Sequence, residues 1–259
     1  MLNYIQAEFY KLLHRKYTYI ALGIFLALEG LLIAGFAFHN SHSYSTPFGG
    51  AVTMIVDLGV IGFCTCLLTG DIVFAGQYKN STLKNEVSFG LSRAQIYLGK
   101  LLTQTLLSVV YLVVMMGFFL GLCAVCLPME AGAGFYSAAD AMTIVGYFLA
   151  AGLPLWIGGQ AALCMCLFLV NGEMASSFLY VGIVFVLETI VDLAGLIIRG
   201  PVGEALLRAV PYFPVRMLNE AKAVVGDMGY LGRAWLVGAF WVAVCTAIGL
   251  YGFNRKEIK

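Results

Sequence analysis

Four acidic residues lie inside long apolar stretches of the sequence, where a charged group is costly to bury. They are Glu29, Asp57, Glu188 and Asp192. A carboxylate in hydrocarbon usually marks a transport pathway, a proton carrier or a hydrogen-bonded contact between helices. Glu188 and Asp192 are four residues apart, so they share one face of a helix. Because these stretches contain no Lys or Arg, we expect no intramembrane ion pair to neutralise the acids.

Two interpretations of the four acids remain open. In the first, they are protonated or hydrogen-bonded structural groups at helix interfaces. In the second, all four are candidate residues of a substrate pathway, and they line an outward cavity that favours cationic or amphipathic substrates.

The sequence contains none of the motifs that would give the chain a catalytic activity of its own. A phosphate-binding loop of the GxxxxGKS/T type is missing, as are a GxGxxG after a strand, an HExxH and a GxSxG. Cys123 and Cys126 form a CxxC, but it lies in an apolar stretch without the polar surroundings of a metal site. His39 and His42 are not arranged with carboxylates. We therefore expect no catalytic residue, no metal ion and no cofactor in this chain.

The composition is that of an integral membrane protein. Of the 259 residues, 61% are hydrophobic and 11% are charged, and the mean hydropathy is +0.90. Soluble domains are only about 45–50% apolar. The net charge of +1 argues against a nucleic-acid partner, because phosphate binding requires a basic excess on one face.

Six apolar runs predict an all-α protein with six transmembrane helices. Each run has at least the roughly 20 residues needed to cross about 30 Å of hydrocarbon. The runs are Tyr17–Phe38, Ala51–Ala75, Leu101–Leu127, Met142–Val170, Met174–Ile198 and Ala234–Phe253. Pro154 stands beside glycines in the fourth run, so we expect that helix to be tilted or kinked.

The first 16 residues predict a short amphipathic helix before the first span. Ile5, Phe9, Leu12 and Leu13 fall on one helical face in the i, i+4, i+7, i+8 pattern. We interpret residues 1–16 as a helix that lies on the membrane surface. The alternative is a charged flank that only anchors the first span.

The distribution of basic residues predicts the orientation in the membrane. Ten Lys and Arg lie in the N-terminal segment, the second loop and the C-terminal tail, and five lie in the fifth loop, residues 199–233. The positive-inside rule places both termini and the second loop in the cytoplasm, although the five charges of the fifth loop count against this. Prolines in the fifth loop predict two short helices, Val202–Val210 and Val215–Val225, dipping into or lying on the outer face.

The second loop carries a dense group of polar residues between two apolar runs. Tyr78, Thr82, Ser92-Arg93 and Gly99-Lys100 occur along it. In this pattern the chain resembles the permease subunits of ABC exporters, specifically the small six-helix type 2 family. The family usually has an acid where this chain has Gln77, and a glycine where it has Ser81.

The resemblance extends beyond this loop to both ends of the chain. It includes Glu8, Lys11 and Leu12 in the N-terminal helix and the ending Gly249–Lys259. It implies a single permease domain over residues 1–259. Its parts are the interfacial helix 1–16, helices one and two in 17–75, the coupling loop 76–100, helices three to five in 101–198, the extracellular loop 199–233, and helix six with the tail in 234–259.

The resemblance further implies that Thr82–Leu91 is a coupling helix that docks into a groove of a separate ATPase subunit. Apolar side chains recur along it at i, i+4 and i+8, with polar ones between them. The candidate coupling residues are Tyr78, Thr82, Leu83, Lys84, Val87, Leu91 and Arg93. The alternative is an interfacial helix that touches only lipid.

A permease of this kind implies a complex with other subunits in a plasma membrane, which we expect to be bacterial. Two permease copies, identical or paired with a related chain, would bind two ATPase subunits, and those subunits would hold the ATP and Mg²⁺. The short outer loops favour a hydrophobic or amphipathic substrate, and small permeases of this appearance resemble those that give resistance to lantibiotics or bacitracin-like peptides. The rival functions are a proton-coupled secondary transporter that uses Glu188 or Asp192, and an intramembrane enzyme, which the missing motifs disfavour.

Overall fold

Helices and the turns between them make up all of the chain that the structure describes. The computed structural model describes residues 2–41, 46–75, 82–88, 90–130, 135–170 and 172–256. Five helical segments are long and apolar enough to cross a membrane, and a bent pair of shorter helices makes a sixth candidate. The predicted all-α membrane protein is therefore confirmed.

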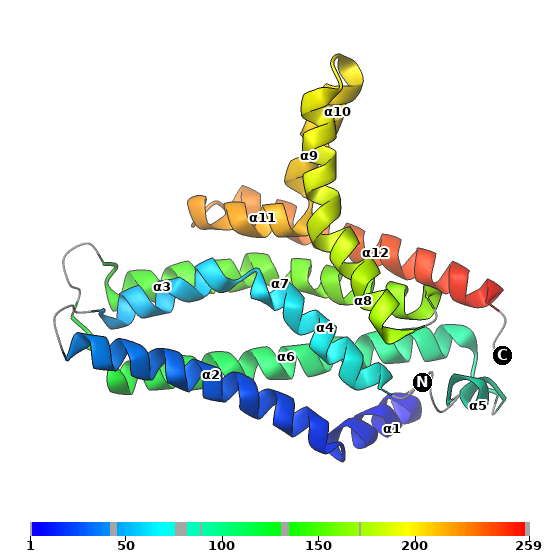
Figure 1. Cartoon of the computed structure of the whole chain (residues 1–259), viewed down its shortest axis with the longest axis horizontal. Coiled ribbons are helices and arrows are strands. Elements are labelled where there is room, and N and C mark those ends of the chain that lie inside the picture. The colour runs from blue at the N-terminus through cyan, green and yellow to red at the C-terminus, as the bar shows by residue number, and fades with distance from the viewer. Residues whose placement is uncertain are drawn as a thin grey trace.

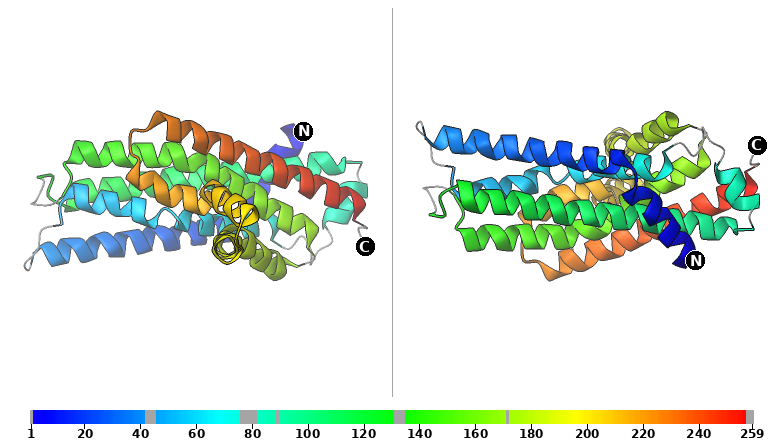
Figure 2. Two further views of the ribbon diagram at one scale, coloured as in Figure 1. Left: turned by 90° about the horizontal axis from the view of Figure 1, so that it is seen from above. Right: turned by 90° about the horizontal axis from the view of Figure 1, so that it is seen from below.

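The long helices run side by side along the longest axis of the molecule (Figures 1 and 2). They are α2 (Lys16–Asn40), α6 (Arg93–Cys126), α7 (Ala138–Leu169) and α12 (Met228–Arg255). Two short helices, α1 (Leu2–Leu13) and α5 (Thr82–Ser88), lie at the end of this bundle where α12 finishes. We call this the α5 end; α3, α7 and α12 begin toward the opposite end (Figure 1).

The centre of the bundle is α7, which is the most deeply buried of the candidate spans. Its close neighbour is α12, and small residues bring the two backbones together. A Cβ on Gly238 of α12 would lie 2.5 Å from the carbonyl of Pro154, and one on Gly158 would lie 3.1 Å from Trp241. Pro154 lies inside α7, which is assigned as one helix from Ala138 to Leu169, and the tilt or kink expected at this residue stays a prediction.

The second predicted span is a broken helix. It consists of α3 (Phe48–Leu58) and α4 (Ile61–Phe74), which meet at an angle of 63°. The break falls at Gly59, where an added Cβ would lie 2.1 Å from the ring of Phe148 on α7. A glycine at the break therefore lets the chain bend closely over α7, a contact that the hydropathy of the run could not predict.

The fifth predicted span leaves the bundle. It begins as α8 (Glu173–Val181), passes through the π-helical turn η1 (Gly182–Val186) and continues as α9 (Leu187–Ile197). With α10 (Pro201–Ala209), α9 forms a helical hairpin that stands off the bundle, roughly across its long axis (Figures 1 and 2). We call α9 and α10 the arm. Gly200, with φ +97°, makes its turn, and a Cβ on Gly203 would lie 1.8 Å from the carbonyl oxygen of Ile198.

The chain returns from the arm to the bundle through further short helices. These are η2 (Val210–Tyr212), α11 (Pro214–Glu220) and η3 (Ala221–Ala223). Val215, Met217 and Leu218 of α11 are buried, and α11 packs on α7. The fifth loop thus contains two short α-helices near the predicted positions, α10 and α11, and the prolines at 201 and 214 each begin one of them.

Candidate functional site

The short helix α5 turns its apolar side chains toward the rest of the chain. Leu83 and Val87, with Leu91 just beyond the helix, are partly buried and pack against the hydrophobic core. Lys84, Asn85 and Ser88 are exposed. The apolar stripe that was expected to enter a groove on another subunit is therefore engaged within this chain, and the polar side of α5 faces outward.

A charge cluster lies beneath α5, formed by Glu86 of α5 with Tyr4, Glu8 and Lys11 of α1 and Lys100 of α6. The Tyr4 hydroxyl donates a hydrogen bond to Glu86 Oε2 at 3.0 Å. The Lys100 ammonium is 3.3 Å from Glu8 Oε2 and 3.8 Å from Glu86 Oε1. Lys11 Nζ is 2.6 Å from Glu8 Oε1. One ammonium group thus joins α6 to both α1 and α5.

The cluster is balanced in charge and, at its centre, hidden from solvent. Lys100 is 3% exposed and Glu8 is 4% exposed. Burial raises the pKa of the Glu8 carboxyl, but Lys100 and Lys11 outweigh it, so the pKa lies below its ordinary value. The Lys100 ammonium also lies 5.4 Å from the centre of the Phe74 ring on α4.

The Gly99-Lys100 pair of the sequence motif has a direct physical explanation in this cluster. A Cβ on Gly99 would lie 2.5 Å from the ring of Tyr4, so glycine at this position lets the Tyr4 ring approach α6 this closely. The next residue, Lys100, then supplies the buried cation. We missed Glu86 in the sequence, because it is a single acid among exposed polar neighbours with no pattern of its own.

Arg93, a predicted coupling residue, binds the end of α12. Its guanidinium donates hydrogen bonds to the carbonyl oxygens of Phe253, Asn254 (3.0 Å) and Lys256 (2.8 Å), and lies 5.5 Å from the centre of the Phe253 ring. Ser92 caps the start of α6 in a reciprocal capping box with Gln95. The Ser92-Arg93 motif therefore starts one helix and caps the end of another.

Two further basic residues at the α5 end act in the same way as Arg93. The Arg15 guanidinium donates to the carbonyl oxygens of Ile72 and Ala75 at the end of α4. The Lys256 ammonium donates to Phe168 (2.8 Å) at the end of α7. Three cations thus face the carbonyl ends of three helices, where the helix dipole is negative.

The structure does not describe the side chains of two of the predicted coupling residues. Tyr78 lies outside the described residues. Thr82 begins α5, and its side chain also lies outside what the structure describes. Their roles remain predictions.

The four acids within the predicted spans do not form one site, and the basic residues that lie near three of them come from outside those spans. Lys222 of η3 binds Asp57 at 2.7 Å. Arg216 of α11 hydrogen-bonds Glu220 at 2.9 Å, and this bond, together with the nearby Glu220, Glu188 and Asp192 carboxylates, raises the pKa of Arg216. The cations come from the fifth loop, whose short helices fold back onto the bundle.

Glu29 stands apart from the other three acids. It lies on α2, and its Oε2 is buried without a hydrogen-bond partner among the described residues.

A buried polar cluster in the bundle was not predicted from the sequence. Gln160 of α7 donates to Thr69 of α4 at 3.0 Å, and Gln104 of α6 donates to the Gln160 side-chain oxygen. All three side chains are at most 1% exposed. We looked for charged residues in the apolar runs and did not consider neutral amides. A glutamine inside an apolar run nevertheless indicates a hydrogen bond between helices.

No group of three or more His, Cys, Asp or Glu in the described ranges could hold a metal ion. His42 lies outside those ranges. Cys123 is buried and Cys126 is exposed, so the two cysteines of the CxxC occupy different environments.

Comparison with known proteins supplies the family. The sequence profile of the family described as ABC-2 family transporter protein matches residues 4–187, from α1 to the first residue of α9. No curated protein matches the chain closely enough to count as a relative. The match covers most of the chain and all of the charge cluster. The chain therefore belongs to the ABC-2 transporter family, and it is a multi-pass membrane permease of an ABC transporter.

Proposed function

We propose that this permease belongs to an exporter driven by a separate ATPase subunit, and that the ATPase acts on the chain through α5. The observation that carries the proposal is the charge cluster. Glu86 fixes α5 to Tyr4 of α1 and Lys100 of α6, so a force applied to the exposed side of α5 reaches two other helices.

The proposed contact surface is the polar side of α5, composed of Lys84, Asn85 and Ser88. These side chains are exposed. Leu83, Val87 and Leu91 anchor the helix to the bundle from its other side. Tyr78 and Thr82 remain proposed contacts, and Arg93 contributes by holding the end of α12 against the start of α6.

In the proposed mechanism, two ATPase subunits hold ATP and Mg²⁺ and work on two permease copies, identical or paired with a related chain. The ATPase must contact α5 differently in each of its nucleotide states, because only a difference in contact free energy can shift the conformational equilibrium of the permease. The α5 end then faces the cytoplasm of a bacterial plasma membrane. The basic residues that cap helix ends there support this orientation.

The proposed substrate is a hydrophobic or amphipathic molecule, such as an antimicrobial peptide of the lantibiotic or bacitracin-like kind. Two features support this class: the apolar surface of the arm, and the acids Glu188 and Asp192 that lie at its base near Arg216. The proton-coupled alternative relies on the same two acids, and a transport assay that requires ATP would separate the two.

Affinity purification of the tagged chain from mild detergent tests the proposal. We expect an ABC ATPase to copurify with the natural chain, and Lys84→Glu with Ser88→Glu to abolish its recovery. Lys16→Glu, a charge reversal at an exposed position at the beginning of α2, serves as the matched control and should leave recovery unchanged. Undiminished recovery of the ATPase with the Lys84→Glu, Ser88→Glu variant would show that the polar side of α5 is not the contact surface.

A further inference from the structure

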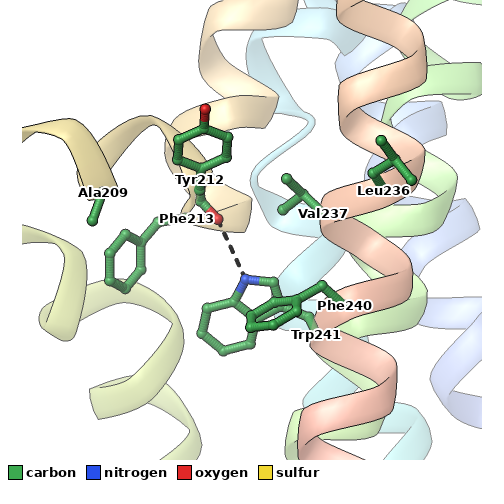
Figure 3. A pocket seen from close by; sticks show the side chains of 7 residues that line it. All are labelled: Ala209, Tyr212, Phe213, Leu236, Val237, Phe240 and Trp241. Atoms are coloured by element: carbon green, nitrogen blue, oxygen red, sulfur yellow. Dashed lines mark hydrogen bonds between the residues drawn. The ribbon is translucent and has the colours of Figure 1, made fainter.

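A pocket of about 380 Å³ opens between α12 and the segment that returns from the arm (Figure 3). Ala209 of α10, Phe213 at the start of α11, and Val237, Phe240 and Trp241 of α12 contribute to its walls. The centres of the Phe213 and Trp241 rings lie 6.1 Å apart, and the ring planes are tilted by 57°. The volume falls within the range of small-molecule sites, about 300–1,000 Å³.

The walls of the pocket offer a ligand almost no hydrogen-bonding group. The indole N–H of Trp241 already donates to the backbone carbonyl of Tyr212 at 3.3 Å. Figure 3 shows the Tyr212 hydroxyl pointing away from Trp241. The part of a ligand that enters this pocket is therefore apolar.

The pocket lies on the part of α12 that the sequence predicts to span the membrane, Ala234–Phe253. Its α12 residues follow Met228 by 8–13 positions, which places them about 12–20 Å along the helix from its start. Leu236 and Phe240, at the mouth, are 73% and 64% exposed. A mouth of exposed apolar side chains at this depth faces the acyl chains of the membrane.

A cation stands between the pocket and the end of the bundle opposite α5. Arg233 precedes Val237 by four residues and Trp241 by eight, so all three lie on one face of α12. Arg233 is about 6–12 Å nearer the start of the helix, and helical side chains tilt in that direction. When the pocket lies at the depth of the lipid acyl chains, the Arg233 guanidinium therefore lies at the depth of the lipid headgroups.

Among the described residues, Arg233 contacts one carboxylate and one aromatic ring, that of Tyr230, whose centre lies 5.3 Å from the guanidinium, and these two contacts leave most of its five N–H donors for a ligand. Among the described carboxylates, only Asp227 comes within ion-pair range, at 3.9 Å, and both side chains are at least half exposed. The other oxygen of Asp227 accepts the backbone N–H of Gly229 as the cap of α12. The Arg208–Glu204 pair on α10, beside Ala209, adds no net charge.

We propose that this pocket binds an acyl chain of an anionic phospholipid from the surrounding membrane, with the lipid phosphate on Arg233. The apolar walls recognise the chain, and the guanidinium recognises the phosphate as a charge-assisted hydrogen-bond acceptor. The site does not depend on the ATPase contact proposed above.

Quenching of Trp241 fluorescence by brominated lipid tests the site. The protein for this experiment carries Trp156→Phe and Trp235→Phe, so that Trp241 is its only tryptophan. It is reconstituted in bilayers of equal phosphatidylglycerol and phosphatidylcholine, with bromine on the chains of one lipid or of the other. We expect brominated phosphatidylglycerol to quench Trp241 about fivefold more effectively, the preference that one basic residue gives for an anionic lipid.

The controls separate this site from ordinary contact with lipid. Trp235 lies on the same helix outside the pocket, half exposed, so a protein with Trp235 as its only tryptophan should be quenched equally by both lipids. Arg233→Gln in the Trp241 protein should remove the preference and leave quenching in place. Ala209→Phe should fill the pocket and reduce quenching by both lipids.

Two outcomes would overturn the proposal. Equal quenching of Trp241 by the two brominated lipids would show that Arg233 selects no anionic lipid. No quenching by either would show that a protein surface, such as a second copy of the chain, covers the pocket. If the protein with Trp235 as its only tryptophan does not fold, a second comparison still tests the proposal. It compares the Trp241 protein that keeps Arg233 with the same protein carrying Arg233→Gln.

Discussion

Lys100 shows how a charged side chain can be retained in an apolar bundle. Its ammonium is buried, and it is stabilised by Glu8, Glu86 and the Phe74 ring. A buried ion pair gives little net stability compared with apolar packing, but the loss of one partner is costly because an uncompensated charge stays buried. We therefore expect the cluster to specify which helices meet.

Removal of the buried cation tests this interpretation. We expect Lys100→Met to lower the free energy of unfolding in mild detergent by about 3–5 kcal/mol, because Glu8 and Glu86 lose their shared cation. Lys11→Met is the matched control: Lys11 is half exposed, so its loss should cost at most about 1 kcal/mol. Equal effects of the two substitutions would contradict a special role for Lys100.

The acid sensitivity of the fold should depend on Glu8. The folded state lowers the pKa of Glu8 below its ordinary value of 4.5, so this carboxylate stabilises the protein above that pH. Its contribution is lost as the pH falls through the folded-state pKa. We expect the melting temperature of Glu8→Gln to change less with acidification than that of the natural chain, and a parallel decline in both proteins would count against the cluster.

Helix ends at the α5 end are organised by basic residues. Arg15, Arg93 and Lys256 hold the carbonyl ends of α4, α12 and α7. The same three residues were counted in the sequence as a charge bias that indicates orientation. In the structure they have a second role, because each satisfies carbonyl groups that a helix terminus leaves without partners.

Loss of the Arg93 cap should loosen the last turn of α12. We expect Arg93→Gln to speed amide hydrogen exchange in residues 251–255 about tenfold, which corresponds to a capping and dipole contribution of about 1–2 kcal/mol. Arg255→Gln is the control in the same turn, since Arg255 lies over the Tyr251 ring. Unchanged amide exchange in Arg93→Gln would show that the Arg93 cap does not stabilise the last turn of α12.

The ion pair between Lys222 and Asp57 joins the fifth loop to the broken helix α3–α4. If the pair is formed in the membrane, Lys222→Met and Asp57→Asn should not have additive effects on stability. We expect a coupling energy of about 1 kcal/mol in the double-mutant cycle, measured by unfolding in detergent. Strict additivity would mean that the fifth loop does not dock on α3.

At the scale of the whole molecule, hydropathy and charge in the sequence were enough to predict an all-α membrane protein with up to six spans. They could not predict the break at Gly59 or the departure of the arm, because both depend on contacts between distant segments. Periodicity likewise identified Leu83, Val87 and Leu91 as one stripe without indicating what the stripe packs against. The packing position of this stripe depends on contacts among Tyr4, Glu86 and Lys100, which are far apart in the sequence.

The arm carries an apolar face that the described chain leaves largely exposed. Ile190, Leu193, Leu196 and Ile197 of α9 are all more than half exposed. An exposed apolar surface of this kind needs lipid or another protein surface to cover it.

A photo-crosslinking amino acid at position 85 tests whether the ATPase acts on the permease through the outward side of α5. In the complex purified with its ATPase, we predict a crosslink from position 85 to the ATPase whose yield changes between the ATP-bound and nucleotide-free states. The same group at position 87, which faces the bundle, should crosslink within the permease. A crosslink to the ATPase from position 87 but not from position 85, or a yield at 85 that is indifferent to nucleotide, would contradict the account.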